Sequence, residues 1–169
     1  MSDTTFDQLR VLVCVGKLTI CWAYIENFLD IIITFIFKSL NGNQIETEIP
    51  RSLSRKLDFM KLAAKQIPIF GPLKDEIIAL VEKLEAAAVT RHDLIHGVMD
   101  VEGLMDSEFE KKEIRIRRLI RKENLHRNVA FSMDELLKHV SSAEVLTEQV
   151  LAMINSILNA IKEKTPKRA

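Results

Sequence analysis

Glycine and proline are scarce in this chain: its 169 residues contain five glycines and four prolines. Because these residues make the turns between short strands, their scarcity excludes a turn-rich β architecture and favours long helices. Basic and acidic side chains number 24 each, so the formal net charge is zero. No global field therefore attracts nucleic acid or a membrane, and any such binding requires a local patch of charge.

Cysteine is equally rare, with Cys14 and Cys21 as the two in the chain. On a helix their positions are about 10 Å apart along the axis, too far for a disulfide, and two thiols in an apolar run are typical of a reducing compartment. Asp3 and Asp7 precede that run, where a signal peptide carries lysine or arginine. The most apolar window, IIITFIF (31–37), is far shorter than a membrane span. We therefore expect a cytoplasmic protein that does not bind membranes.

Apolar residues make up 47% of the chain, which is enough for the core of one globular domain. They recur at helical spacing in four segments, the first of which begins with Leu9, Leu12 and Val13. The four helices predicted from this spacing cover residues 6–40, 51–66, 73–95 and 133–163. Short connections favour an all-α, up-and-down four-helix bundle. We expect a single domain over residues 1–165, followed by a disordered tail at 166–169.

The helical period is lost between residues 98 and 132, before the fourth predicted helix. EIRIRRLI (113–120) alternates apolar and charged residues, which is the period of a strand. HRNVAFS (126–132) is its candidate partner across a turn at KEN (122–124), and VMDV (98–101) is a candidate third strand. The pattern predicts a small β-hairpin inserted between the third and fourth helices.

The fourth helix carries a start signal of its own. Ser132 is followed three residues later by Glu135, just before an apolar helical pattern. This is the spacing of a capping box, in which each side chain hydrogen-bonds to the backbone N–H of the other residue. We therefore expect the helix to begin directly after Ser132.

Ionisable residues are concentrated at the predicted end of the third helix, in TRHDLIHGV (90–98). Four of them lie within six residues and are followed by Gly97: Arg91, His92, Asp93 and His96. One interpretation is structural, because cations interact favourably with the carbonyl end of a helix and glycine commonly follows the last turn. The other interpretation is an active site. Residue types alone do not separate the two.

Arg91 and His96, with a polar residue directly after the arginine, form an R-polar-x-x-x-H pattern at one end of the predicted bundle. In these residues the chain resembles the HEPN superfamily of small helical bundles, which includes many metal-independent ribonucleases and toxins. WAYIENFLD (22–30) is similar to the first helix of stand-alone bacterial members, and SRKLDFM (54–60) to their second-helix Lys-Leu segment. A strand-rich insert and a closing helix follow in the same order, so the resemblance covers nearly the whole chain.

The chemistry of metal-independent RNA cleavage suits the residue types of the motif. Histidine as a residue type can act as base or acid near neutral pH, which makes His96 a candidate for both roles, while Arg91 offers a charged fork of donors to phosphate oxygens. His92 fills the polar position, where it either orients its neighbours or shares the proton transfer. One motif supplies one arginine and one histidine, half of what acid–base cleavage needs, and the resemblance implies a homodimer that brings two motifs together across a twofold axis.

Three further residues are candidates for supporting the motif. Glu26 is a carboxylate on the apolar first helix, and Arg91 or Lys56 is its candidate partner if it is buried. Asp93 is adjacent to the motif, but on a helix its side chain points about 100° away from that of His92. Trp22 is expected to be a core residue.

The predicted hairpin is strongly basic. On a strand, Arg115 and Arg117 share one face, which can hold an RNA backbone beside the motif. The alternative is a solvated face balanced by acidic residues such as DSEFE (106–110). The candidate RNA-binding residues are Arg115, Arg117, Arg118 and Arg121.

Two other classes compete with a ribonuclease. The first is a metal-dependent hydrolase, because His92 and His96 lie four residues apart on one helix face. Metal sites usually need three or four protein ligands, so we expect no metal and no cofactor. The stronger alternative is a non-catalytic module that binds RNA or nucleotides or regulates a partner. The presence of both Arg91 and His96 favours the ribonuclease. The resemblance also implies a toxin or defence effector, held by an antitoxin or regulatory protein.

Overall fold

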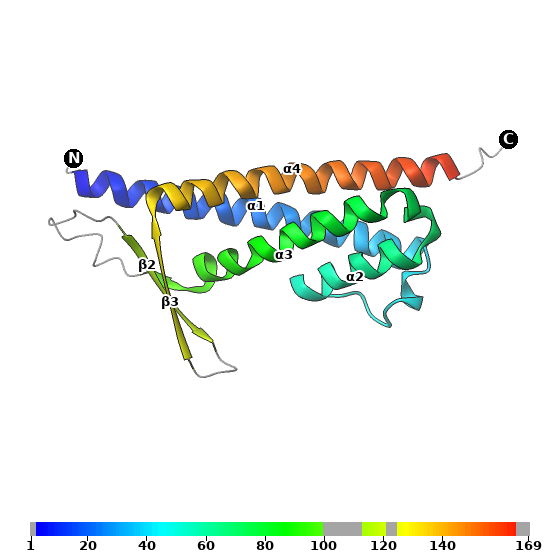
Figure 1. The fold of residues 1–169 in the computed structure, drawn as a ribbon, viewed down its shortest axis with the longest axis horizontal. Helices are drawn as coiled ribbons and strands as arrows, with labels where there is room; N and C mark the ends of the chain where they lie inside the picture. The colour runs from blue at the N-terminus through cyan, green and yellow to red at the C-terminus, as the bar shows by residue number, and fades with distance from the viewer. Residues whose placement is uncertain (1–2, 100–112, 121–124, 165–169) are drawn as a thin grey trace. The chain divides into compact units, whose positions relative to one another are not determined.

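The computed structural model describes residues 3–99, 113–120 and 125–164. They form a mainly α-helical bundle with a small antiparallel sheet placed between the third and fourth helices in the chain, as predicted (Figure 1). The helices and strands are α1 (Asp3–Ser39), α2 (Leu53–Gln66), α3 (Lys74–His96), β1 (Val98–Met99), β2 (Glu113–Ile120), β3 (Leu125–Ser132) and α4 (Met133–Lys164). Short 3₁₀ turns at Gly42–Gln44 and Pro68–Leu73 lie in the first two connections. The predicted tail at 166–169 lies outside the described residues.

The described chain divides into two compact units, and α1, α3 and α4 each continue from one unit into the other. Their segments, named here unit 1 and unit 2, are Met1–Trp22 with Ala87–Glu144, and Ala23–Ala86 with Val145–Ala169. All three boundaries fall inside helices, so the expected single domain, residues 1–165, stays a prediction. Each unit has its own set of buried apolar side chains.

Unit 2 is built from helices alone. Its core includes Phe59 and Phe70, both fully buried. On its surface, Lys61 Nζ lies 2.6 Å from a carboxylate oxygen of Glu85, and this hydrogen bond raises the pKa of Lys61. The apolar spacing in the sequence therefore predicts the buried core of unit 2, and ion pairs such as Lys61–Glu85 lie at its surface.

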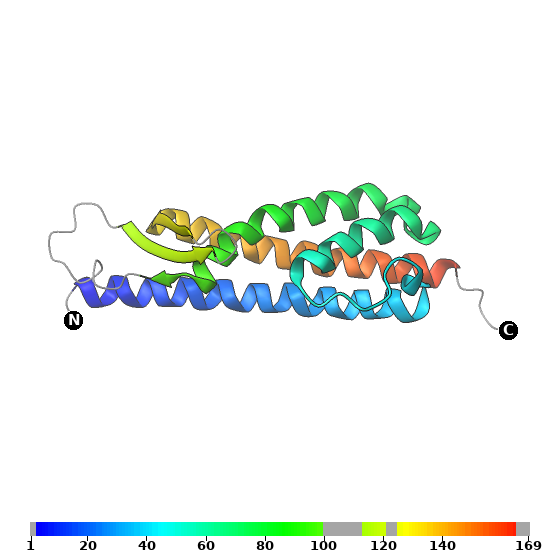
Figure 2. The same ribbon diagram turned by 90° about the horizontal axis from the view of Figure 1, so that it is seen from below.

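The three-stranded sheet of unit 1 has the order β1-β2-β3, and β2 and β3 run side by side as a hairpin in both views (Figures 1 and 2). Ile114 pairs with Phe131 and Ile116 with Val129. Both isoleucines are 2% exposed. The alternation in the sequence thus correctly predicted the strand and the face that it buries. Of the predicted VMDV strand, 98–99 form β1, and 100–101 lie outside the described residues, as does the KEN turn at 122–124.

The predicted capping box begins α4. Glu135 Oε2 accepts hydrogen bonds from the Ser132 backbone N–H at 2.7 Å and from its hydroxyl at 2.9 Å. In return, Ser132 Oγ accepts a hydrogen bond from the Glu135 N–H at 3.2 Å. These bonds from Ser132 lower the pKa of the Glu135 carboxyl, because they favour its charged form.

The apolar side chains of α1 do not all face a core. Leu9, Leu12 and Val13 share the helical spacing of the buried residues, yet they are between 50% and 65% exposed. The stretch Leu9–Ser39 is long and apolar enough to cross a membrane: its most apolar 18-residue window has a mean hydropathy of 1.7, and 33% of that window is buried. The core helix of a soluble protein and a signal sequence have the same properties, so this is weak evidence, and the cytoplasmic location stays a prediction.

Candidate active site

The motif, Arg91–His96, forms the C-terminal end of α3, in unit 1. His96 is the final residue of the helix, and the Gly97 N–H donates to the Asp93 carbonyl at 3.0 Å. Gly97 has no positive φ, so it is not the left-handed helix stop that the sequence indicated. A Cβ at this position would overlap the Ile116 side chain and the Asp93 carbonyl. Glycine is therefore required because β2 packs directly against the end of the motif.

Arg91 and His96 converge at this helix end. Arg91 Nη1 lies 3.3 Å from His96 Nε2. A guanidinium can only donate hydrogen bonds, so this contact is a hydrogen bond when Nε2 carries no proton. The His96 side chain is exposed, whereas Arg91 is half-buried. The helix end therefore places an exposed imidazole beside a permanent cation.

Arg91 packs over the buried indole ring of Trp22. The Arg91 Cζ atom is 5.9 Å from the centroid of the Trp22 ring, within the range of a cation–π contact, and Trp22 is 1% exposed. Trp22 is the core residue that the sequence predicted. Its role as a platform for the arginine was missed, because it depends on how two helices far apart in the sequence pack. The only signal was an aromatic residue in the WAYIENFLD segment (22–30).

His92 and His96 form a pair of rings on the same face of α3. Their centroids are 5.4 Å apart and the ring planes are inclined by 33°. Both side chains are exposed, as the four-residue spacing on a helix allows. Asp93 points elsewhere and is 1% exposed, in agreement with the direction predicted for it. The motif thus separates into two exposed histidines, the half-buried Arg91 and a buried aspartate.

The two other supporting candidates, Glu26 and Lys56, belong to unit 2. Lys56 is buried, and its Nζ lies 2.7 Å and 2.8 Å from the two carboxylate oxygens of Asp30. The carboxylate bound to Lys56 is therefore that of Asp30, a residue that sequence reasoning did not select. Glu26 is half-buried, and its supporting role stays a prediction.

The basic strand β2 pairs with β1, which follows the motif in the chain. Arg117 is the register partner of Val98, two residues after His96, and both Arg115 and Arg117 are exposed. They occupy the face of β2 opposite to the isoleucines, as the alternation predicted. Ile116 of the same strand packs against Gly97. The backbone of Arg118 lies in β2, but its side chain and all of Arg121 are outside the described residues.

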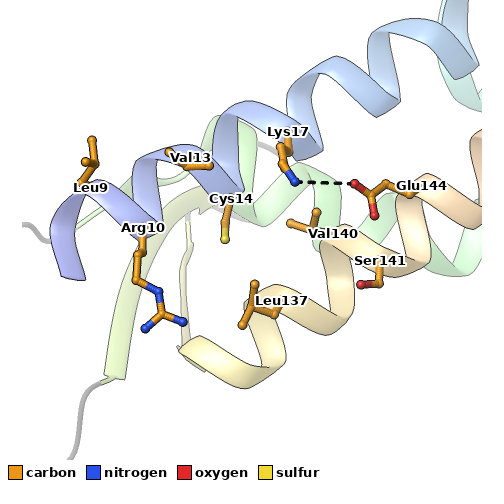
Figure 3. A pocket seen from close by; sticks show the side chains of 9 residues that line it. All are labelled: Leu9, Arg10, Val13, Cys14, Lys17, Leu137, Val140, Ser141 and Glu144. Atoms are coloured by element: carbon orange, nitrogen blue, oxygen red, sulfur yellow. Dashed lines mark ion pairs between the residues drawn. The ribbon is translucent and has the colours of Figure 1, made fainter. Parts of the chain in front are cut away.

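A separate pocket of about 330 Å³ lies in unit 1 between the N-terminal parts of α1 and α4 (Figure 3). Cys14 points into it from α1 and Leu137 from α4. Lys17 and Glu144 form an ion pair of 3.9 Å at one end. The residues that line it are Leu9, Arg10, Val13, Cys14, Lys17, Leu137, Val140, Ser141 and Glu144. None of them belongs to the motif, and the mainly aliphatic lining offers no imidazole for proton transfer.

Across the described ranges, no three histidine, cysteine, aspartate or glutamate side chains gather in an arrangement that could hold a metal ion. Comparisons with known proteins add no relative: no family model, no curated protein and no solved structure matches this chain. The resemblance to the HEPN superfamily therefore rests on the residues and the element order quoted above.

Proposed function

We propose that this protein is a metal-independent endoribonuclease of HEPN type, with its active site at the end of α3 and two such ends combined in a homodimer. One observation carries the proposal: the Arg91 guanidinium and the His96 imidazole converge at 3.3 Å on an exposed helix end. A ribonuclease needs these two groups to be accessible and close together, whereas a purely structural helix end has no need to direct the arginine at a histidine nitrogen.

The proposed chemistry follows from these two side chains. The unprotonated Nε2 of His96 removes the proton of the RNA 2′-hydroxyl, and the 2′-oxygen attacks the neighbouring phosphorus. Arg91 donates hydrogen bonds to the phosphate oxygens on which negative charge accumulates. The bond from phosphorus to the 5′-oxygen breaks with its electron pair on that oxygen, which takes a proton from the His96 of the second motif in the homodimer. The products are a 2′,3′-cyclic phosphate and a free 5′-hydroxyl. No metal and no cofactor takes part in the proposal.

RNA is proposed to reach the motif along the outer face of β2. Arg115 and Arg117 are exposed on that face, and the register places Arg117 beside Val98, directly after the motif. Guanidinium groups on one face of a strand bind a phosphate backbone without reading its sequence. Because the chain has no net charge, this binding is local and should weaken steeply with added salt.

The second candidate is a non-catalytic module that binds RNA or nucleotides and regulates a partner. The exposed Arg115 and Arg117 favour it, since this surface can bind RNA without any reaction at His96. A toxin or defence role, an antitoxin or regulatory partner and a cytoplasmic location belong to the proposal through the HEPN resemblance alone.

The deciding experiment is cleavage of a mixed RNA pool in EDTA by the wild type and by His96→Ala. The control is His139→Gln, which changes a half-buried histidine in the same unit whose ring meets Phe131 edge-on at 5.5 Å. Size-exclusion chromatography checks that all three proteins have the same oligomeric state. The proposal expects cyclic phosphate ends from the wild type and the control only. RNA that binds but stays intact, or equal cleavage by all three, favours the non-catalytic module.

A further inference from the structure

We propose that a second copy of this chain pairs with the exposed side of α1 in unit 1, so that the two α1 helices run parallel around a twofold axis. This contact is separate from the proposed catalytic dimer and does not rest on the ribonuclease function. It is carried by a row of uncharged residues, named here the α1 seam: Leu9, Val13, Gly16 and Ile20. Its three large side chains are between 50% and 57% exposed.

The α1 seam has the spacing of a coiled-coil interface. Its members follow one another at intervals of four, three and four residues, which places Leu9 and Gly16 at position d of the seven-residue repeat and Val13 and Ile20 at position a. Branched side chains at a with leucine at d are the combination that favours two parallel strands. The helix that fits this surface therefore carries the same pattern, and a second α1 supplies it.

The α1 seam lies on the side of the helix away from the core and the motif. Val11, Leu18 and Trp22 are 1–2% exposed and form the buried side of α1. Ile20 and Trp22 are two residues apart, so their directions differ by about 200° on a helix. Because Arg91 lies over the Trp22 ring, the paired helices leave the motif open to RNA and to the catalytic dimer.

The charges beside the α1 seam select the parallel direction. Arg10 and Lys17 occupy the e positions, and Leu12 and Thr19 occupy the g positions. In a parallel pair, e residues face the g residues of the other helix, so each cation meets an uncharged side chain. In an antiparallel pair, e residues face each other, which would set Arg10 against Lys17 of the second copy. Repulsion between like charges disfavours that arrangement.

The first test is the mass of the assembly in solution. Ile20→Glu changes a side chain that is 57% exposed, so the single chain should fold, and light scattering should give half the wild-type mass because a carboxylate is unfavourable in an apolar contact. Leu151→Glu is the control, at a leucine 45% exposed on α4 in unit 2, and should keep the wild-type mass. Equal masses for all three proteins would overturn the proposal, and flotation of the wild type with phosphatidylserine vesicles would then assign the α1 seam to a membrane.

The second test is a disulfide across the twofold axis, in a chain whose Cys14 and Cys21 are replaced by alanine. Ile20→Cys should form a linked dimer in a glutathione redox buffer, since residues at position a face their own copies in a parallel pair. Thr19→Cys, exposed but turned by about 100°, should link far less. Preferential linkage of Leu9→Cys chains to Ile20→Cys chains would show an antiparallel pair and overturn the proposal. Loss of RNA cleavage in the wild type would remove the proposed function and leave both of these results unchanged.

Discussion

The two units use charge in different ways. In unit 2, a buried lysine is matched by a carboxylate, as Lys56 is by Asp30 at 2.7 Å. In unit 1, Arg91 is held against an imidazole and an indole, at a helix end that carries a second exposed histidine. An ion pair of the first kind is explained by the cost of burying a charge. The cost of burying a charge does not explain the exposed cluster at the end of α3, and this contrast supports the proposal of an active site in unit 1.

The largest effect is expected from replacing Arg91. Arg91→Lys keeps one positive charge but loses the planar fork, and should lower kcat/KM for RNA cleavage by about 10²–10³-fold, or roughly 3–4 kcal/mol of transition-state binding. The matched control is Arg55→Lys in unit 2, where Arg55 forms an ion pair with Glu46 at 2.6 Å. Steady-state kinetics should show full activity for this control. Equal activity of the two variants would break the contrast between the units.

A second comparison removes one partner of the buried ion pair at a time. Asp30→Ala leaves the Lys56 ammonium, which is 4% exposed, without its carboxylate, and should lower the free energy of unfolding by about 3 kcal/mol. Lys56→Met leaves only the half-exposed Asp30 and should cost less than about 1 kcal/mol. Urea unfolding measures both values. The reverse order would show that the pair is not held by desolvation of the lysine.

Gly97→Ala tests the contact between the motif and the sheet. The new methyl group would overlap Ile116 and the Asp93 carbonyl, and overpacking of this kind typically costs about 1–3 kcal/mol. RNA cleavage should also fall, because α3 and β2 have to move apart at the motif. Gly16→Ala is the control, since a Cβ at Gly16 meets nothing within 4 Å, and it should be neutral or slightly stabilising.

The smallest expected effect is at the start of α4. Ser132→Ala removes the capping box and should lower the free energy of unfolding by about 1 kcal/mol at neutral pH. Folding lowers the pKa of the Glu135 carboxyl. The carboxylate therefore contributes to the free energy of unfolding above the ordinary carboxyl pKa, and this contribution is lost as the pH falls through the lowered value. Thermal unfolding should therefore separate Glu135→Gln from the wild type near neutrality and not in strong acid.

Local patterns were enough to predict most of the fold. The helical period located all four helices, the period of two located β2, and Ser132 with Glu135 marked the start of α4, because each of these signals acts between residues a few positions apart. The same kind of pattern misplaced Leu9, Leu12 and Val13, which share the helical spacing but are exposed. A helical period shows that a face is apolar and does not show that another element covers it.

The sequence by itself determined the helical architecture, the alternating faces of the hairpin and the presence of Arg91, His92 and His96 at one helix end. Only the tertiary structure decided that Trp22 lies under Arg91, that Asp30 binds Lys56 and that Ile116 requires a glycine at 97. The physical reason is distance along the chain. Spacing within one helix sets which side chains share a face, whereas the partners of that face come from segments whose approach depends on packing of the whole core.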